Sequence, residues 1–205
     1  MSFKVVDLGV SRGGVPVLEG VNFAAEPGEA IVLTGPNGVG KTTLLRTIAK
    51  LQPPYTGKVI VPDTDAIAYA GHADGIKTVL SVTENLSFWA KVYGHDDISD
   101  ALSTFNLTDL ANRAAGSLSA GQKRRLGLAR LAVTGRPIWV LDEPTVSLDK
   151  ASVSMFGDAV RAHLAGGGTA IIASHIDMGL EVRVVDLTPF RARATVARNF
   201  DEAFL

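Results

Sequence analysis

A glycine-rich turn that carries one lysine is the part of this sequence best suited to bind phosphate. Its eight residues, Gly35-Pro36-Asn37-Gly38-Val39-Gly40-Lys41-Thr42, fit the pattern G-x-x-x-x-G-K-[ST] at every position. Glycines let successive backbone N–H groups point inward around a phosphate, and the amino end of a following helix adds a positive dipole. Lys41 would then reach the β- and γ-phosphates, and the Thr42 hydroxyl would ligate Mg²⁺. The turn therefore predicts a nucleoside triphosphate as ligand.

Two adjacent carboxylates follow a short apolar strand later in the chain. The strand is Ile138–Leu141, and Asp142 and Glu143 come directly after it. Asp142 at the end of the strand is placed to hold Mg²⁺, directly or through water. Glu143, one residue later, is placed to polarise an attacking water as a general base. Together with the phosphate-binding turn, the pair indicates hydrolysis of the triphosphate.

A third motif precedes a predicted helix over Ala120–Val133. It reads Leu118-Ser119-Ala120-Gly121-Gln122, and Ser119 with the backbone N–H of Gly121 would offer another anion site at a helix amino end. The pentapeptide resembles the LSGGQ signature of the ATP-binding-cassette (ABC) ATPases, with alanine in place of the first glycine. Two further segments resemble that family: Ser147-Leu148-Asp149 its D-loop, and His175 its switch histidine.

The resemblance covers nearly the whole chain and carries expectations about fold, assembly and site. It implies an α/β fold, the P-loop NTPase fold of ABC nucleotide-binding domains, with an antiparallel β subdomain and an inserted helical subdomain. It also implies that Thr43 belongs to the ATP-binding set and that His175 contacts the γ-phosphate. Two copies would form a head-to-tail homodimer. Each ATP would lie between Lys41 of one copy and the signature of the other, residues Ser119, Ala120, Gly121 and Gln122.

Two positions depart from the general ABC pattern. His72 stands where most members have a glutamine that senses Mg²⁺ and the membrane partner. An imidazole can serve near the metal shell, although a loop histidine without a role is the alternative. Near the adenine, Arg12 stands where members carry an aromatic residue, and it either stacks on the base or is an exposed turn residue.

A narrower resemblance rests on Gly71–Thr78, on Thr83–Trp89 and on the LSAGQ form of the signature. These segments resemble the ATP-binding subunit of the ABC complex for cytochrome c maturation, often called the haem exporter. The implied partners are integral membrane permease subunits and haem-handling membrane proteins. An ATPase for another transported substrate remains the alternative.

The elements that must position these residues alternate between strand and helix patterns, which predicts an α/β core with a helical arm. Strands are expected over 3–8, 17–25, 30–34, 59–61, 66–70, 138–141, 170–173 and 182–187. Helices are expected over 42–50, 82–93, 98–106, 120–133 and 150–165. We treat residues 1–205 as one ABC ATPase domain, with the helical subdomain at about 79–133.

Side chains outside these motifs have two competing interpretations. Phe88, Trp89 and Tyr93 on the helix over 82–93 either dock a membrane partner or pack the helical arm internally. His95 and His163 lack a motif, and we predict them to be surface residues.

Composition limits the function classes. Of the 205 residues, 46% are hydrophobic and 20% are charged, which is typical of a globular domain. A net charge of −1 argues against a nucleic-acid partner, and the absence of cysteine excludes thiol chemistry and disulfides. No apolar run approaches the roughly 18 residues of a membrane span, and residues 1–14 read as a strand and turn rather than a signal peptide. Together with these observations, the family resemblance implies a peripheral protein on the cytoplasmic face of the bacterial inner membrane.

Two rival functions are weaker. Soluble ABC ATPases that act on ribosomes usually carry two cassettes, and those that act on DNA insert long coiled coils. Here one cassette is present, and Lys41 and Ser119 are only 78 residues apart (119 − 41). A nucleotide switch without turnover is disfavoured because Glu143 is intact.

Overall fold

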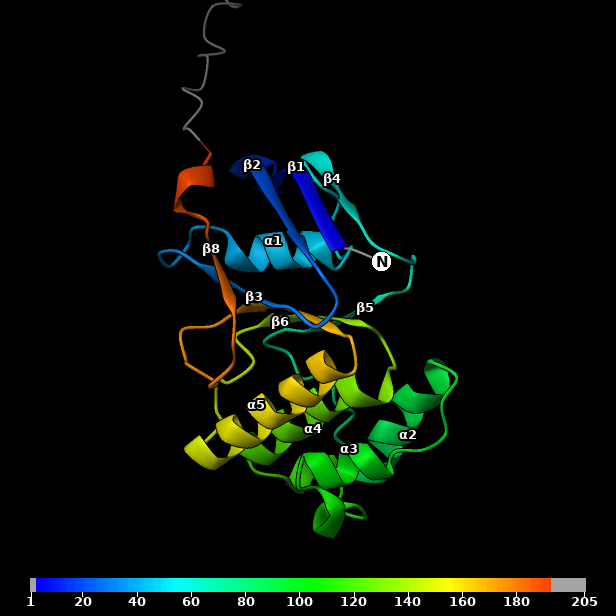
Figure 1. Ribbon diagram of the computed structural model, residues 1–205. Helices are drawn as coiled ribbons and strands as arrows, with labels where there is room; N and C mark the ends of the chain where they lie inside the picture. The colour runs from blue at the N-terminus through cyan, green and yellow to red at the C-terminus, as the bar shows by residue number, and fades with distance from the viewer. Residues whose placement is uncertain (1–2, 193–205) are drawn as a thin grey trace, which may run out of the picture.

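The computed structural model describes residues 3–192, which form two sheets with a helix between them. The smaller sheet has the order β2-β1-β4 and is antiparallel throughout. Its strands are β1 (Phe3–Arg12), β2 (Val15–Ala25) and β4 (Thr56–Ile60). In Figure 1 this sheet covers one side of α1 (Lys41–Ile48), whose other side faces the second sheet.

The larger sheet is parallel, with the order β5-β6-β7-β3-β8. Its strands are β3 (Ala30–Thr34), β5 (Ile67–Ala70), β6 (Ile138–Asp142), β7 (Thr169–Ala173) and β8 (Arg183–Asp186). Every residue of β6 and β7 is buried. Their apolar runs, Ile138–Leu141 and Ala170–Ala173, suit a parallel sheet that is covered on both faces.

The alternation of side chains along the central strands divides the interior into two cores. In β6, Ile138 and Val140 pack toward α1 and the antiparallel sheet, whereas Trp139 and Leu141 pack toward the other face. That other face is covered by α4 (Ala120–Val133) and α5 (Lys150–Ala165). The two-residue repeat of a strand produces this division directly.

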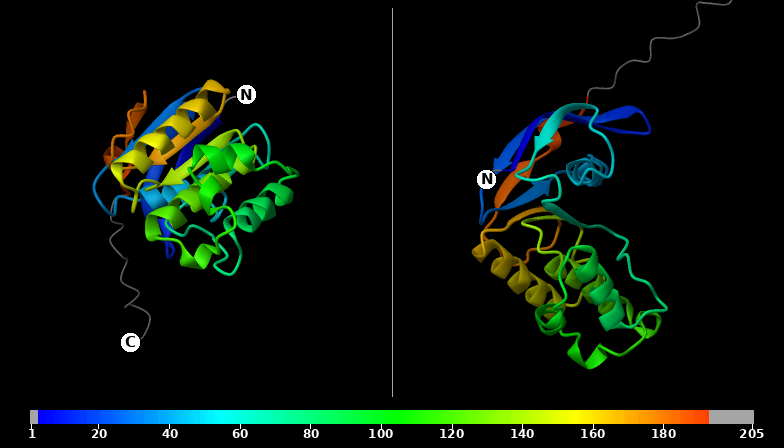
Figure 2. Two further views of the ribbon diagram at one scale, coloured as in Figure 1. Left: turned by 90° about the horizontal axis from the view of Figure 1, so that it is seen from below. Right: turned by 90° about the vertical axis from the view of Figure 1, so that its right-hand side faces the viewer.

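The helical arm projects from the end of the parallel sheet, as both views of Figure 2 show. It contains α2 (Val82–Val92) and α3 (Ser99–Thr104), which pack against α4. Capping boxes start two of these helices: Ser81 with Glu84 begins α2, and Ser119 with Gln122 begins α4. Short 3₁₀ turns lie at 108–110, 115–117 and 188–190.

The expected antiparallel subdomain, parallel core and inserted helices are all present. The ranges expected for β3, α4 and α5 agree with the structure, and the other elements differ by a few residues. The first helix ends at Ile48 rather than at residue 50, because Ala49 caps it and Lys50 has a φ of 58°. Within residues 3–192, no helix is both long and apolar enough to cross a membrane.

Candidate nucleotide site

The phosphate-binding turn, the Asp142-Glu143 pair and His175 follow strands β3, β6 and β7, which end at one edge of the parallel sheet. Register aligns Leu33 of β3 and Asp142 of β6 with Ala173 of the strand between them. The loops that leave this edge begin with Gly35, Glu143 and Ser174, so three motifs far apart in sequence start side by side. Ligands of open α/β sheets bind outside the carboxyl ends of the strands.

The glycine-rich turn connects β3 to α1 with a backbone that requires glycine. Gly40 is the residue before α1, with a φ of 118°, and a Cβ there would lie 3.1 Å from Leu18 Cγ. No side chain caps this helix, so its first N–H groups face the turn. Lys41 Nζ donates to the carbonyl of Gly35 at 2.8 Å, which folds the ammonium back over the turn. This geometry suits a bound phosphate.

Asp142 lies at the bottom of the site and is almost fully buried, with 1% of its surface exposed. Thr42 Oγ1 donates to its Oδ1 at 3.1 Å, and the Tyr69 hydroxyl donates to its Oδ2 at 3.4 Å. A hydroxyl beside a carboxylate is a donor set that fits Mg²⁺ completed by phosphate and water oxygens. Burial, and then the Asp142 carboxylate, raise the pKa of Tyr69 to about 12, so this phenol remains a hydrogen-bond donor.

Glu143 and His175 approach each other across the ends of β6 and β7. His175 Nε2 lies 3.6 Å from Glu143 Oε1, and the glutamate side chain is the more buried of the two. Glu143 has a φ of 48°, a left-handed conformation that is uncommon for a non-glycine residue. Its N–H donates to the carbonyl of Ala173 at 2.8 Å, which ties the strained residue to the neighbouring strand.

Lys41, Thr42, Asp142 and Glu143 line an open cleft of about 330 Å³, and His175 lies outside it. The cleft is lined by Arg12, Val17, Asn37, Gly38, Gly40, Lys41, Thr42, Thr43, His72, Asp142 and Glu143. Both departures from the general ABC pattern, Arg12 and His72, therefore lie beside the phosphate-binding turn. A larger cavity of about 780 Å³ lies at the amino ends of β3 and β8, where Glu29 and Arg183 already form an ion pair.

The signature and the D-loop lie together but outside this cleft. Ser119 Oγ accepts from the N–H of Gln122, and the Gln122 side chain accepts from the N–H of Ser119. A Cβ on Gly121 would approach the carbonyl of Ser147 to 3.3 Å. Asp149 caps α5 by accepting from the N–H of Ser152, which lowers the pKa of its carboxyl. Among the described residues, none of 119–122 lines the cleft around Lys41.

Two residues at this site, the half-buried Tyr69 and the buried Arg124, have no counterpart among the sequence predictions. The Tyr69 hydroxyl donates to Asp142 from the adjacent strand. The sequence signal that could have identified Tyr69 is its place in a short apolar strand, which pairs with β6. Arg124 is 5% exposed on α4, although it lies in a Lys-Arg-Arg run typical of a solvated helix face.

The prediction that His163 is a surface residue is wrong. Its ring stacks on Trp139 with centroids 4.0 Å apart, because α5 packs on the face of the sheet toward which Trp139 points. For the aromatic side chains on α2, the two interpretations were docking to a partner and internal packing, and different residues fit each of them. Trp89 packs between Tyr93 and the Arg130 guanidinium, whereas Phe88 is 40% exposed.

Three features define this protein as a P-loop ATPase with a signature helix. They are the strand, turn and helix at Gly35–Thr42, the Asp142-Glu143 pair and the inserted helical arm. Residues 18–146 match the ABC transporter family model. An ABC transporter ATP-binding protein from Pyrococcus furiosus has a similar structure, with a TM-score of 0.83 and 28% identity over 94% of this chain and 100% of that one. CbiO1 of Clostridium perfringens, part of the ABC transporter complex cbiONQ, matches with a TM-score of 0.72 and 26% identity over 85% and 78%.

Curated relatives narrow the class. The cytochrome c biogenesis ATP-binding export protein CcmA of Ruegeria pomeroyi is 62% identical over the full length of both chains. The protein of that name from Rhodobacter capsulatus is 61% identical, again over the full length of both. The chain belongs to the ABC transporter family, within its group of cytochrome c biogenesis ATP-binding export proteins. It is an ATPase subunit that binds ATP.

Proposed function

We propose that this chain is the ATP-hydrolysing subunit of a membrane export complex that energises haem handling for c-type cytochrome maturation. Identity above 60% over the whole length of curated relatives with this role in their names carries the proposal. The residues around Lys41, Asp142 and Glu143 supply the ATPase chemistry that the role needs. Residues 1–205 act in this proposal as one ATPase domain, with the helical subdomain at about 79–133.

ATP binding is assigned to the phosphate-binding turn. The backbone N–H groups of residues 38–42 and the Lys41 ammonium would hold the β- and γ-phosphates. Thr42 and Asp142 would hold Mg²⁺, which neutralises charge on the phosphate oxygens when bound. Tyr69 keeps Asp142 oriented through its hydroxyl. Arg12 would lie against the adenine, and His72 would lie beside the γ-phosphate because both line the same cleft.

Hydrolysis is assigned to Glu143. Its carboxylate would accept a proton from the attacking water, and Lys41 would stabilise negative charge on the phosphoryl oxygens. His175 lies within 3.6 Å of that carboxylate, so it can contact the γ-phosphate and the base at once. Ser119 of a second copy would close the site from the other side, in a head-to-tail homodimer.

The membrane partner is assigned to the exposed part of α2 and the loop before it. Phe88 is 40%, Val92 57% and Val79 87% exposed, and Lys77 lies over the Phe88 ring at 4.6 Å. Such an apolar patch suits an integral membrane subunit that needs a docking site beside the nucleotide cleft. The chain would then be held peripherally on the cytoplasmic face of the membrane, with haem-handling membrane proteins in the same complex.

Docking is tested with Phe88→Ala, because Phe88 is 40% exposed. Its ring meets that of Trp89 edge to face at 5.4 Å, whereas the contacts of Trp89 with Tyr93 and Arg130 remain in the variant. We expect the variant to bind ATP and keep its thermal midpoint within about 2 °C while leaving the membrane fraction. Tyr55→Ala is the control, since Tyr55 is also half-exposed but lies near the antiparallel sheet. Equal membrane recovery of both variants would exclude Phe88 from the docking site.

The biological role is tested in a strain that lacks the protein. We expect covalent haem on periplasmic and membrane c-type cytochromes to disappear from denaturing gels, while spectra of b-type cytochromes stay normal. Complementation with Lys41→Ala should resemble the deletion, and Lys58→Ala, which alters an exposed lysine on β4, should restore the haem. Normal covalent haem in the deletion strain would leave an ABC ATPase for another substrate.

A further inference from the structure

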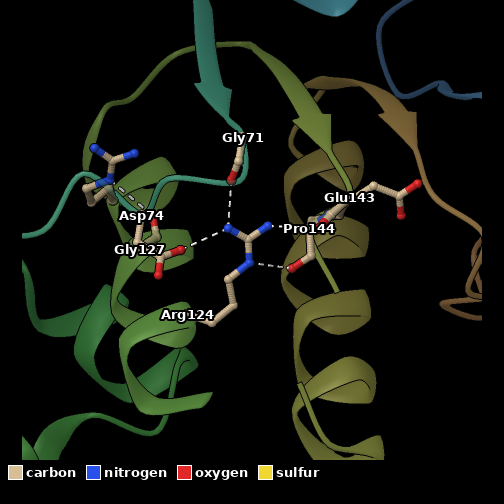
Figure 3. A network of polar contacts seen from close by, with 7 residues as sticks. Gly71, Asp74, Arg124, Gly127, Glu143 and Pro144 are labelled. Atoms are coloured by element: carbon tan, nitrogen blue, oxygen red, sulfur yellow. Dashed lines mark hydrogen bonds and ion pairs between the residues drawn. The ribbon is translucent and has the colours of Figure 1, made fainter. Parts of the chain in front are cut away.

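Arg124 is the most extensively bonded side chain near the nucleotide site. Its Nη1 donates to the carbonyl of Gly71 at 2.7 Å and to Asp74 Oδ1 at 2.9 Å. Nε donates to the carbonyl of Pro144 and Nη2 to that of Glu143, each at 2.9 Å. Figure 3 shows the guanidinium between the loop after β5 on one side and the end of β6 on the other.

The three segments that meet at Arg124 belong to different parts of the site. Arg124 itself is on α4, the helix that begins at Ser119 of the signature. Gly71 immediately precedes His72, which lines the nucleotide cleft. The carbonyls of Glu143 and Pro144 belong to the turn that carries the proposed base. One planar guanidinium therefore links the signature helix, the His72 loop and the base.

The His72 loop is otherwise fastened to the helical arm. A Cβ on Gly127 would lie 2.7 Å from Asp74 Cβ, so the glycine lets the loop lie flat against α4. At its far end, Lys77 exchanges two hydrogen bonds with the side chain of Asn85 on α2, at 2.8 and 3.0 Å. The loop and the arm thus form one unit, and Arg124 joins that unit to the end of β6.

The hydrogen bond from Arg124 to the carbonyl of Glu143 matters for the backbone conformation of Glu143. Its left-handed backbone, with a φ of 48°, is strained and persists only where the surroundings hold it. The N–H of Glu143 is held by Ala173 and its carbonyl by Arg124, so both peptide groups that flank the residue are fixed. Loss of the Arg124 bond would free one of them and let the carboxylate change direction.

We propose that Arg124 is a positioning residue, which holds the base Glu143 and the His72 loop in register with the signature helix. The inference rests on the role of Glu143 given under Proposed function. The guanidinium is suited to the task because its rigid fork of donors reaches several acceptors in fixed directions, whereas an ammonium is one compact charge. Turnover, rather than ATP binding, should depend on it.

The test compares Arg124→Gln with Arg125→Gln in the full chain. Arg125 is a matched control, because it lies on the same helix and also donates to two carbonyls, those of Phe105 and Asn106, both within the helical arm. We expect Arg124→Gln to lower kcat for ATP by about 10- to 100-fold with KM changed less than about threefold, since a misplaced group costs rate rather than affinity. Arg125→Gln should keep kcat within about twofold.

Two further variants keep the test decisive if Arg124→Gln folds poorly. Arg124→Lys retains the buried charge, and Asp74→Asn retains the shape of the anionic partner, so both should fold and show the same selective loss in kcat. Hydrogen exchange should increase in residues 71–74 and 143–147 together, with α4 and β6 unchanged. A KM that rises in step with a falling thermal midpoint, or an equal loss of kcat in Arg125→Gln, would overturn the inference.

The Glu143→Gln variant distinguishes a failure of the positioning role of Arg124 from a failure of the catalytic role of Glu143. If Glu143→Gln retains parental turnover, Glu143 is not the base and the assignment itself fails. If Glu143→Gln abolishes turnover while every Arg124 variant keeps parental kcat, the base assignment stands and the positioning role of Arg124 is wrong.

Discussion

Asp142 shows how individual residues set the electrostatics of the site. A carboxylate with 1% exposure loses its hydration, and the hydroxyls of Thr42 and Tyr69 replace part of that solvation. The bond from Tyr69 requires the protonated phenol, because a phenolate beside Asp142 would be both buried and repelled. That requirement explains the direction of the Tyr69 pKa shift.

The shift predicts how stability changes at high pH. The pKa of Tyr69 rises from about 10 in the unfolded chain to about 12 in the fold, so its contribution to stability is full below pH 10 and is lost as pH rises toward 12. We expect Tyr69→Phe to lose less stability than the parent between pH 9 and pH 11 in urea titrations. Tyr55→Phe removes an exposed tyrosine and should follow the parent curve. Identical curves for all three proteins would contradict the assignment.

At the scale of elements, the contact between α5 and β6 is made partly by an aromatic stack. Trp139 and His163 lie nearly parallel, at an interplanar angle of 11°, and Gly168 leaves room for the imidazole. His163 Nε2 is buried without a hydrogen-bond partner in the described structure. Burial lowers the pKa of His163, because the protonated ring could not be solvated there.

This packing predicts a loss of stability in mild acid. Stability from the neutral ring is present above the unfolded pKa of about 6.5 and is lost as pH falls through the lower folded pKa. His163→Phe keeps an aromatic ring on Trp139 without a titrating group. We expect its thermal midpoint to fall less than that of the parent between pH 7.5 and pH 5, by a difference of about 2 °C or more. His95→Gln, at an exposed position, is the control, and a parental response in His163→Phe would contradict the prediction.

At the scale of the whole molecule, the two halves of the expected ATP site lie on different subdomains. The phosphate-binding turn is on the core, whereas Ser119 begins the helix that packs against the arm. The residues that line the cleft around Lys41 leave one side open to solvent, and the signature is not among them. A head-to-tail second copy would bring Ser119 to that side, which links ATP binding to assembly.

We predict that replacement of the base Glu143 changes the oligomeric state of the protein. Glu143→Gln keeps the ATP-binding groups but cannot accept a proton, so we expect hydrolysis to fall by about 10²-fold or more and a closed dimer to accumulate. Size-exclusion chromatography with Mg·ATP should show the dimer, and omission of nucleotide should return the monomer.

Ser119→Asp in the same background provides the control. Aspartate caps a helix as well as serine does, so α4 should form normally, but its charge would repel the phosphates of the partner's ATP. The double variant should remain monomeric. A dimer that forms without ATP, or that survives Ser119→Asp, would contradict the head-to-tail arrangement.

Local sequence patterns were sufficient to predict the motifs and most of the helices and strands. Lys41, Thr42, Asp142 and Glu143 follow local patterns that the fold then brings to one sheet edge. The range of α4 could be predicted because Ser119 marks its start, and that of α5 because Asp149 and three glycines mark its ends. Such signals act within a few residues of chain, so a pattern is sufficient to locate them.

The side chains that support those motifs became evident from the packing of the folded chain. Arg124 reads as one of three consecutive basic residues, and its burial follows from the loop at 71–74 lying on α4. Tyr69 reaches Asp142 because β5 pairs with β6, and His163 meets Trp139 because α5 packs on the face of the sheet that Trp139 occupies. The bond from Arg124 to Gly71 spans 53 positions and that from Tyr69 to Asp142 spans 73. They depend on strand register and helix packing, which no local pattern specifies, and therefore they could not be predicted from the sequence.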